Sequence, residues 1–373
     1  MTRPAAPTVA IVGGGPAGAV AALVLARRGL RPVVLEAEPG PGPKAGETLP
    51  PALGPLLRRL GVEERLASGG HLRSHGIRTF WGSPRPGESS FLASPFGSGW
   101  HVDRRAFEAA LAEAARAAGA EWRWGRRVLG CARTAGGWRL EVEGAKGREA
   151  VEAAFVADAS GRRSRLARRL GARRVRYDRL VGVFGILASP TPDTDTFTLV
   201  EAVEDGWWYS AELAGGRLAA CFFGDGDLLD RRLLHADPAV WRERLGRSAA
   251  TRERIEGRGY APAGPLSVLP AESSRLDAIS GDGWIALGDA AAAYDPLSSH
   301  GIASAMGSGF YGGHAVADLL AGRSEAHIAY LDLMQRTYGA YLDLLREHYS
   351  RERRWPGAPF WRRRQGEAFA RVA

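Results

Sequence analysis

Apolar and polar positions follow a regular order over the first part of the chain. Residues 8–12 form a short apolar run, and a glycine-rich turn follows it. Apolar residues then recur at helical spacing between residues 21 and 26, and residues 33–35 form a second apolar run that ends at Glu36. This order predicts a strand, a tight turn, a helix and a second strand.

Similar changes from strand to helix pattern occur later in the chain. Asp103 is a plausible N-cap for an amphipathic helix that begins at Arg104. An apolar run ends at Asp158 before a turn and a basic helix, and another ends at Asp289 before a long helix of small residues. Between residues 175 and 262, apolar and polar positions alternate with the period of two that is typical of antiparallel strands. These patterns predict an α/β fold that contains a separate antiparallel sheet.

The first turn carries the glycine spacing of a dinucleotide-binding site. Gly13, Gly15 and Gly18 match G-x-G-x-x-G, with Pro16 and Ala17 between them. The first glycine permits the tight turn, the second lets the backbone approach a pyrophosphate, and the third lets the helix pack on the strand. Glu36 follows the second strand, where its carboxylate can accept hydrogen bonds from ribose hydroxyls. An acid at this position favours an unphosphorylated ribose, so we expect FAD or NAD.

Composition and charge narrow the class of protein. The chain has 373 residues, 45% of them hydrophobic, and a formal net charge of +9. The N-terminal residues lead directly into the first strand and leave no room for a signal peptide, and no apolar run approaches the length of a membrane span. Two cysteines in unrelated contexts suggest neither a metal site nor a disulfide framework. We therefore expect a cytoplasmic protein without a metal.

The net positive charge has two explanations. One is a general preference for arginine, and the other is an acidic partner or substrate. Nothing in the sequence resembles a helix-turn-helix, a zinc finger or a stacking motif, so we expect no nucleic acid partner.

The ordered motifs resemble the flavoprotein aromatic hydroxylase superfamily, which also contains flavin-dependent halogenases and geranylgeranyl reductases. The resemblance covers nearly the whole chain. It implies an FAD-binding domain of the glutathione reductase type, interleaved with an antiparallel β-sheet substrate domain and followed by a C-terminal helix. The implied FAD-binding domain comprises residues 1–75, 100–175 and 262–340. The implied substrate domain comprises residues 76–99 and 176–261, and residues 341–373 form the C-terminal helix and a basic aromatic tail.

The resemblance also implies roles for particular residues. Arg104 matches the superfamily arginine that contacts the cofactor. Asp158 matches the acid of the middle motif, which Gly161 and Ser164 complete, so Asp158 and Gly161 are also expected to bind the cofactor. Asp289, preceded by Gly288, would bond a ribitol hydroxyl. The backbone from Pro296 through Gly301 to Ile302 would face the isoalloxazine edge. The segment Gly46-Glu47-Thr48-Leu49-Pro50 resembles the G-E-x-x-x-P stretch of halogenase-like members, so Glu47 and Thr48 are also expected beside the flavin.

The substrate side is less certain from sequence. Trp207, Trp208 and Tyr209 would either pack in a sheet core or line an aromatic substrate pocket, and the two roles are compatible. Ser298, Ser299 and His300 lie in the late motif and are the candidate catalytic residues. For His300 we weigh a hydrogen-bonding spacer beside the flavin against a proton donor or acceptor.

Halogenation is disfavoured by the residues themselves. Superfamily halogenases carry a lysine in the strand after the G-E segment, and alignment of "SHGIRTF" on that strand puts Ser74 there. There is no lysine between Lys44 and Lys146, and Ser298 stands where tryptophan halogenases have an acid.

The C-terminal sequence, with "GETLPP", "GWWYS" and "DPLSSHGI", resembles a smaller subgroup. Its members modify tryptophan in a partner enzyme during maturation of the cysteine tryptophylquinone of lysine ε-oxidase and glycine oxidase. The tail would then dock an acidic protein substrate, although its aromatic residues could instead fold back and its arginines be merely solvated. The tail arginines are Arg351, Arg353, Arg354, Arg362, Arg363 and Arg364, and its aromatic residues are Trp355, Phe360 and Trp361.

We therefore expect an FAD-dependent monooxygenase that hydroxylates an electron-rich aromatic ring, with O₂ as co-substrate. A tryptophan side chain of a partner protein is one candidate substrate, and a small molecule is another. No second G-x-G-x-x-G marks a separate nicotinamide-binding domain, so electrons would come from transiently bound NAD(P)H or from reduced flavin of an external reductase. The alternatives are an alkene reductase of the geranylgeranyl reductase type, a halogenase, and a non-catalytic flavin-binding chaperone.

Overall fold

A six-stranded sheet forms the centre of the N-terminal part of the protein. The computed structural model describes residues 7–42, 44–192 and 194–366. The order is β21-β22-β12-β1-β2-β8, and all pairs are parallel except the edge pair of β21 and β22. The strands are β1 (Thr8–Val12), β2 (Arg31–Leu35), β8 (Glu121–Arg123), β12 (Phe155–Asp158), β21 (Ser280–Gly281) and β22 (Trp284–Ala286).

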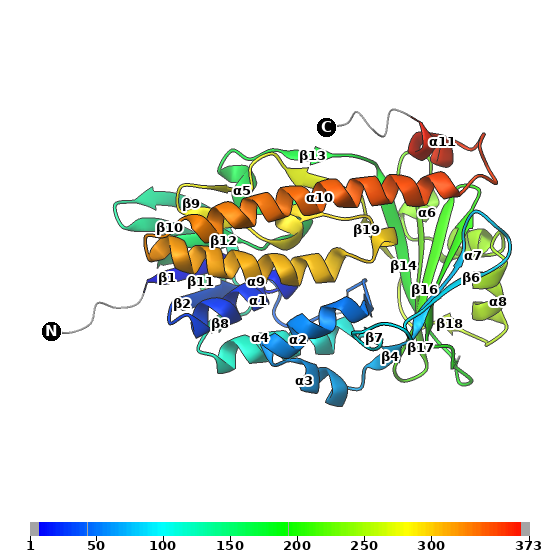
Figure 1. Ribbon diagram of the computed structural model, residues 1–373, viewed down its shortest axis with the longest axis horizontal. Helices are drawn as coiled ribbons and strands as arrows, with labels where there is room; N and C mark the ends of the chain where they lie inside the picture. The colour runs from blue at the N-terminus through cyan, green and yellow to red at the C-terminus, as the bar shows by residue number, and fades with distance from the viewer. Residues whose placement is uncertain (1–6, 43, 193, 367–373) are drawn as a thin grey trace.

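The register of this sheet brings the predicted motifs together. Val12 at the end of β1 pairs with Asp158 on one side and with Leu35 on the other. The segments after β1, β2 and β12 therefore begin at one edge. In open parallel sheets, ligands bind at this carboxyl edge. Helices α1 (Pro16–Arg27), α4 (Arg104–Ala117) and α9 (Gly301–Leu320) pack together beside the sheet (Figure 1).

A larger sheet forms the other end of the molecule (Figure 1). Its order is β18-β14-β17-β16-β15-β5-β6, with β19 also paired to β14. All of its pairs are antiparallel except that of β15 and β5. The strands are β5 (Gly76–Phe80), β6 (Gly87–Ser90), β14 (Leu180–Ala188), β15 (Phe197–Val203), β16 (Gly206–Leu213), β17 (Arg217–Asp225), β18 (Ala261–Pro262) and β19 (Ser267–Pro270).

The two faces of this sheet have different partners. Helices α6 (Arg231–Leu234), α7 (Pro238–Leu245) and α8 (Ala250–Glu256) cover the outer face (Figure 1), where Trp208 packs with Phe222 and Trp241. The inner face points to the six-stranded sheet domain and carries Trp207 and Phe223, which stack with ring centroids 4.1 Å apart. Successive side chains alternate between these faces.

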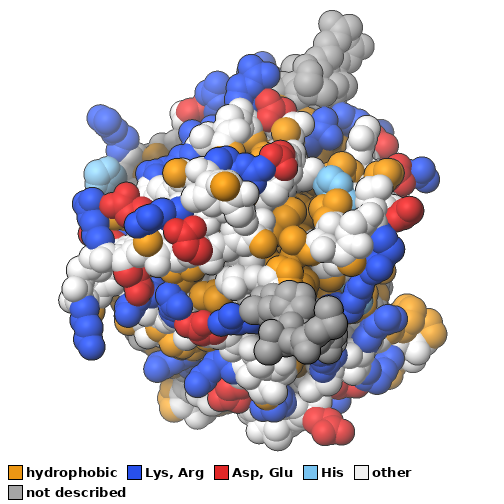
Figure 2. Space-filling view, turned by 90° about the vertical axis from the view of Figure 1, so that its left-hand side faces the viewer, with side chains coloured by type: hydrophobic (Ala, Val, Ile, Leu, Met, Phe, Trp, Pro, Cys, Tyr) orange, Lys and Arg blue, Asp and Glu red, His pale blue; other side chains and the backbone are white. Residues whose placement is uncertain are grey.

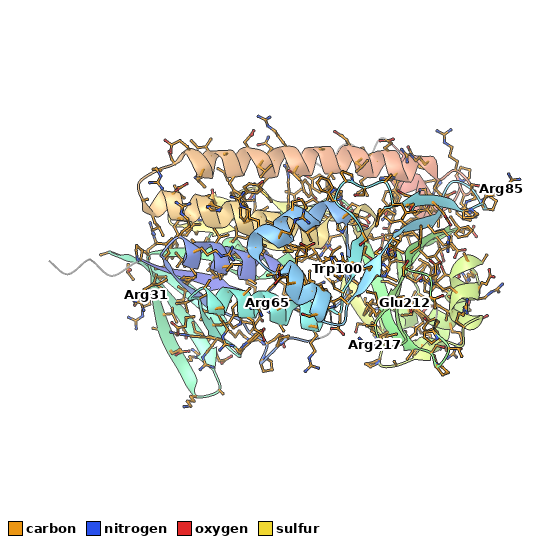
Figure 3. The ribbon with its side chains drawn as sticks, turned by 60° about the horizontal axis from the view of Figure 1, so that its bottom comes forward. Arg31, Arg65, Arg85, Trp100, Glu212 and Arg217 are labelled. Carbon is orange, nitrogen blue, oxygen red and sulfur yellow. The ribbon has the colours of Figure 1, made fainter. Side chains whose placement is uncertain are left out.

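The junction between the two parts is held by polar contacts. Arg217 at the start of β17 pairs with Asp103, the N-cap of α4, at 3.0 Å. Figure 3 places Arg217 and Trp100 along this junction. The hydroxyl groups of Thr48 and Tyr209 are 2.8 Å apart and form a second link.

The remaining elements are short or peripheral. Small sheets contain β3 (Thr48–Leu49), β4 (Leu72–Ser74) and β7 (Gly99–His101); β9 (Arg127–Thr134), β10 (Gly137–Gly144) and β11 (Gly147–Ala153); and β13 (Arg174–Arg176), β20 (Ser274–Leu276) and β23 (Ala292–Ala293). The other helices are α2 (Gly54–Leu60), α3 (Glu63–Ser68), α5 (Arg165–Arg169), α10 (Glu325–Arg351) and α11 (Pro359–Gln365).

Two of the predicted boundaries differ from the structure. The large sheet includes β19, so it extends beyond residue 261, because β14 is long enough to pair with a returning strand. The C-terminal helix α10 begins at Glu325 rather than near residue 341. Its buried side chains keep helical spacing throughout, so the helix is continuous. They are Tyr330, Met334, Tyr338, Tyr341, Leu345 and Tyr349.

The described part of the tail folds back onto the large sheet. Phe360 and Trp361 are buried, and Trp361 Nε1 donates to the carbonyl oxygen of Val203 at 2.9 Å. Arg364 is also buried and pairs with Asp225 at 2.7 Å. The expectation that these aromatic residues anchor a partner is therefore wrong, because they are part of the core. Arg351, Arg353 and Arg362 are exposed, while residues 367–373 lie outside the described part.

The surface mixes charges of both signs. On the face shown in Figure 2, basic and acidic side chains are interspersed around a narrow apolar strip. Within the described residues, none of the helices is both long and apolar enough to cross a membrane.

Candidate active site

A cavity of about 750 Å³ lies between the carboxyl edge of the six-stranded sheet and the inner face of the large sheet. Many of the predicted site residues line it. They are Gly13, Gly15, Pro16, Ala17, Glu36, Glu47, Thr48, Arg104, Gly161, Tyr209, Asp289, Pro296, Ser299, Gly301 and Ile302. The cavity thus joins motifs that are up to 289 positions apart in the chain.

The first glycine turn has the geometry that its sequence predicts. Gly13 has φ +106°, and a Cβ there would lie 2.3 Å from the carbonyl oxygen of Ala159. At Gly18 a Cβ would lie 2.0 Å from the carbonyl oxygen of Gly13, so this residue serves the packing of α1 and does not line the cavity. At Gly15, by contrast, nothing lies within 4 Å of the Cβ position. This space and the N-terminus of α1 together suit a pyrophosphate group.

Glu36 supports the same turn. Its carboxylate accepts hydrogen bonds from the backbone N–H groups of Gly14 at 2.6 Å and Glu38 at 2.9 Å. It also lines the cavity, so it can face a ribose while it fixes the loop.

Asp158 does not line the cavity, contrary to the prediction that it contacts the cofactor. It is fully buried, and its carboxylate accepts from the backbone N–H groups of Ser160, Leu166 and Ala167 at 2.8 to 3.0 Å. An aspartate after a strand can accept hydrogen bonds from the free N–H groups of the next turn, and Asp158 has this role. Ser164 is buried as well and donates to the carbonyl oxygen of Ala290 at 2.8 Å.

The late motif supplies one wall of the cavity. Asp289 lines it, and its carboxylate lies 3.6 Å from Arg162 Nε. Gly288 does not line it: its φ is +57°, and it packs against Ala17. Asp295 caps the turn that begins at Pro296, by accepting from the N–H of Leu297 at 2.8 Å.

Two of the three predicted catalytic residues lie outside the cavity wall. Ser298 Oγ donates to the carbonyl oxygen of Asp295 at 2.7 Å. His300 Nδ1 is 2.5 Å from the carbonyl oxygen of Ser298, and the ring lies beside Tyr294. Both side chains thus serve the turn itself. Only Ser299 of this group lines the cavity.

Glu47 is the most unusual residue of the cavity wall. It is 2% exposed, and neither carboxylate oxygen has a hydrogen-bond partner among the described residues. Burial raises the pKa of Glu47 to about 7, although the charge of Arg104 opposes the rise. Burial, and next the charge of Glu47, raise the pKa of Tyr209. An unpaired carboxyl group with a pKa near neutrality is typical of a group that exchanges protons.

Of the three adjacent aromatic residues on β16, only Tyr209 lines the cavity. Trp207 points to the same face but is buried behind Phe223. Trp208 points to the opposite face, under α7. The prediction that both tryptophans line the substrate pocket is therefore wrong, because the pleat turns one away and packing covers the other.

Sequence patterns alone do not indicate the other aromatic residues of the cavity wall. Phe184 on β14 lies opposite Cys221 on β17, and both line the cavity with Phe223. Their periodicity marks them as sheet residues, but only the strand register puts them at this site. Leu269 on β19 completes this apolar wall.

Lysine is scarce at this site. Among the described lining residues the only lysine is Lys44, and its Nζ pairs with Glu108 at 2.5 Å. Ser74 is buried in β4 and does not line the cavity.

The fold and the cavity define a class of protein. The site fits FAD in an extended pose. It has an open glycine turn at a helix N-terminus, an acid after β2, and the Arg104 side chain on its wall. The family model described as "FAD binding domain" matches residues 6–332, so the chain belongs to this family. It is an FAD-dependent oxidoreductase of the superfamily that contains the flavin monooxygenases and halogenases.

Comparisons with individual proteins agree with this family assignment. The chain is 29% identical over 357 residues to LodB of Marinomonas mediterranea, described as an FAD-dependent oxidoreductase, and the match covers 95% of each chain. The myxobacterial chondrochloren halogenase CndH has the same fold, with TM-score 0.89 and 23% identity over 99% of this chain and 90% of its own. The peptidyl tryptophan dihydroxylase QhpG is 26% identical, with TM-score 0.78 over 97% of this chain and 79% of its own.

Proposed function

We propose that this protein is a monooxygenase that hydroxylates a tryptophan side chain of a partner polypeptide. The observation that carries the proposal is the cavity wall, where Glu47 and Tyr209 meet the apolar side chains of Phe184, Phe223 and Leu269. The one lysine among the described lining residues, Lys44, is paired with Glu108. A lysine is the residue that the halogenases of the superfamily would need. Similarity to LodB and to QhpG, which is essential for tryptophylquinone cofactor biogenesis, supports the choice of substrate.

The chain's own residues would divide the work as follows. The turn of Gly13 and Gly15 and the carboxylate of Glu36 would hold the cofactor, and Asp289 would orient its sugar chain. Phe184 and Phe223 would exclude water from the reacting ring. Bound FAD, once reduced, supplies the activation of O₂.

Glu47 would handle the proton that the aromatic carbon must lose when it gains a hydroxyl group. Its carboxyl group is unpaired and buried at the cavity wall. The Tyr209 hydroxyl is bonded to Thr48, Thr48 lies 3.2 Å from Thr198, and Thr198 lies 3.0 Å from His101 Nε2. This chain of hydroxyl groups ends at a buried histidine whose pKa is lowered to about 3 by burial, so His101 is neutral. We therefore assign this proton transfer to Glu47 rather than to His300, whose ring is bonded to the backbone of its own turn.

The electron donor follows from the same proposal. The six-stranded sheet offers one glycine turn, which FAD would occupy, so NAD(P)H or a separate reductase would reduce the flavin from outside.

The test uses the FAD-loaded protein, reduced without air and then mixed with oxygen and a probe. The probes are a tryptophan-containing β-hairpin peptide and N-acetyltryptophanamide. Mass spectrometry should show one or two added oxygen atoms on the peptide, with the oxygen derived from ¹⁸O₂. Equal reaction of N-acetyltryptophanamide would point to a small-molecule hydroxylase. A product with two added hydrogen atoms from an alkene probe, and no oxygen incorporation, would favour the alkene reductase.

A further inference from the structure

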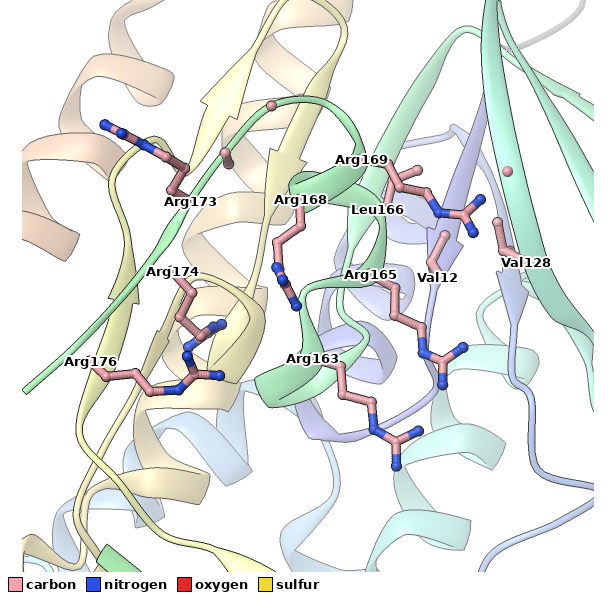
Figure 4. Close-up of a pocket in the computed structure, with 13 residues that line it drawn as sticks. Val12, Val128, Arg163, Arg165, Leu166, Arg168, Arg169, Arg173, Arg174 and Arg176 are labelled. Atoms are coloured by element: carbon pink, nitrogen blue, oxygen red, sulfur yellow. The ribbon is translucent and has the colours of Figure 1, made fainter. Parts of the chain in front are cut away.

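A second cavity, of about 760 Å³, lies beside the first (Figure 4). Seven arginines line it, four from the turn and helix that follow β12 and three from β13 and the residue before it. They are Arg163, Arg165, Arg168, Arg169, Arg173, Arg174 and Arg176. No acidic and no aromatic residue is among the described lining residues.

Four of these arginines lack a carboxylate partner. Arg163, Arg165, Arg168 and Arg169 are exposed, and no carboxylate of the described chain lies within ion-pair distance of them. Like charges gathered in one cavity repel each other, so this arrangement costs folding free energy unless an anion binds.

The other three arginines are partly used by the fold. Arg173 pairs with Asp277 at 2.9 Å, and Arg176 lies 3.5 Å from Glu272. Arg174 donates to the carbonyl oxygens of Asp289 and Ala290, and burial lowers its pKa. The unpaired charge of the cavity therefore comes from the α5 segment.

Backbone groups of α5 do not provide the anion site. The N–H groups of Leu166 and Ala167 already donate to Asp158. Any anion must be bound by the guanidinium groups, whose paired N–H donors match the oxygen spacing of phosphate.

The cavity adjoins the one in which we expect FAD and extends beyond it. Val12, Val128, Arg163 and Arg165 line both cavities, whereas Arg168, Arg169 and Arg176 line only the second. Its size is that of a small-molecule site rather than of a flat protein contact. No aromatic side chain offers a surface on which a base could stack, so the recognised part is the anion.

We propose that this arginine cavity binds the diphosphate group of a second, dissociable ligand, separate from FAD. Several phosphate charges are needed to match four free guanidinium groups. A nucleoside diphosphate and a pyridine dinucleotide both carry this group. The proposal does not depend on the reaction proposed above.

The test is calorimetric titration of the FAD-loaded protein with pyrophosphate, ADP, NADH and NADPH. All four should bind, and Arg168→Ala with Arg169→Ala should weaken the affinity by about tenfold or more, because two charge-assisted contacts to the phosphates are lost. The matched control is Arg139→Ala with Arg148→Ala, which removes equal charge from exposed positions on β10 and β11. The control should bind as the wild type does.

Comparison of the ligands separates their sources. Tighter binding of NADH than of ADP indicates a pyridine dinucleotide, and equal binding of ADP and pyrophosphate indicates the diphosphate alone. The FAD absorbance of every variant must equal that of the wild type. If alanine disturbs FAD, Arg168→Lys with Arg169→Lys keeps the charge but removes the paired donors, and affinity should still fall.

Two results would overturn the proposal. One is unchanged affinity in both the alanine and the lysine variants. The other is absence of binding by all four phosphates when a polyglutamate peptide binds, which would identify a carboxylate partner.

Discussion

The hydroxyl group of Tyr349 donates a hydrogen bond to Asp295 Oδ2 at 2.7 Å. The bond joins the end of helix α10 to the turn that precedes Pro296 on the cavity wall. Trp207 Nε1 in turn donates to the Tyr349 hydroxyl at 3.2 Å, so the inner face of the large sheet belongs to the same network. Residues far apart in the chain thus position the late motif.

Tyr349→Phe should therefore weaken both the fold and the cofactor site. Removal of one partner from a buried hydrogen bond costs about 1 to 3 kcal/mol. We expect a loss of this size in the free energy of unfolding by urea, together with weaker FAD binding by fluorescence titration. Tyr311→Phe is the control, because Tyr311 is 52% exposed. Identical unfolding of the Tyr349 variant and the wild type would contradict the role of this bond.

Glu47→Gln should change how stability depends on pH. The folded-state pKa of about 7 lies above the usual value of 4.5, so the folded protein retains a proton that the unfolded chain releases. Because of Glu47, the free energy of unfolding should fall as pH rises from 4.5 to about 7. The full loss is about 3 kcal/mol. The glutamine variant should match the FAD-free wild type near pH 4.5 and exceed it above pH 7.

Urea denaturation across this range measures the effect. Burial also raises the pKa of Asp295 to about 7, but this group titrates in both proteins, so their difference isolates Glu47. Parallel pH profiles of the two proteins would show that folding does not raise the pKa of Glu47.

Gly15→Val should abolish FAD binding while it leaves the fold intact. Nothing lies within 4 Å of the Cβ position, so the new side chain begins in open space and occupies the position expected for the pyrophosphate. We expect a colourless protein whose unfolding free energy is close to that of FAD-free wild type. Asp289→Ala should give a partial loss of affinity. A yellow Gly15→Val protein would mean that FAD binds elsewhere.

Arg364→Ala should be among the most destabilising changes in the tail. Arg364 and Asp225 are each 2% exposed and pair with each other, and removal of one partner from a buried pair costs about 3 to 5 kcal/mol. Arg362→Ala is the control, since Arg362 is exposed on the same helix. Thermal and urea denaturation should separate the two variants. Equal stability would mean that α11 does not pack as described.

Chloride or bromide should leave the products of turnover unchanged. The only lysine among the described lining residues is held by Glu108, and Ser74 is buried away from the cavity. Mass spectrometry of the reaction with bromide present checks this expectation. A brominated tryptophan would require a different assignment of the cavity.

The sequence predicts site residues most reliably where they lie close together along the chain. The turn from Gly13 to Gly18 and the acid at Glu36 lie within one strand-helix-strand unit, so their positions follow from local geometry. The family match confirms the FAD-binding fold that these residues predict.

The sequence predicts less well where two uses of one residue compete. An aspartate such as Asp158 can bind a ligand or cap the next turn, and the choice depends on which N–H groups lie within reach. Tyr209 and Trp208 are neighbours on β16 and therefore point to opposite faces of the sheet. Which face meets the cavity depends on tertiary packing. The burial of Trp361 depends on a contact with Val203, 158 positions away.

Helix α10 also limits how the molecule can move. Near its start, Tyr330 donates to the carbonyl oxygen of Ala286 in the six-stranded sheet, and near its end Tyr349 contacts Trp207 in the large sheet. A helix of 27 residues is about 40 Å long and bends little. Hinge opening between the two sheets would break contacts at one of its ends. We therefore expect the two sheets to move as one rigid body during turnover.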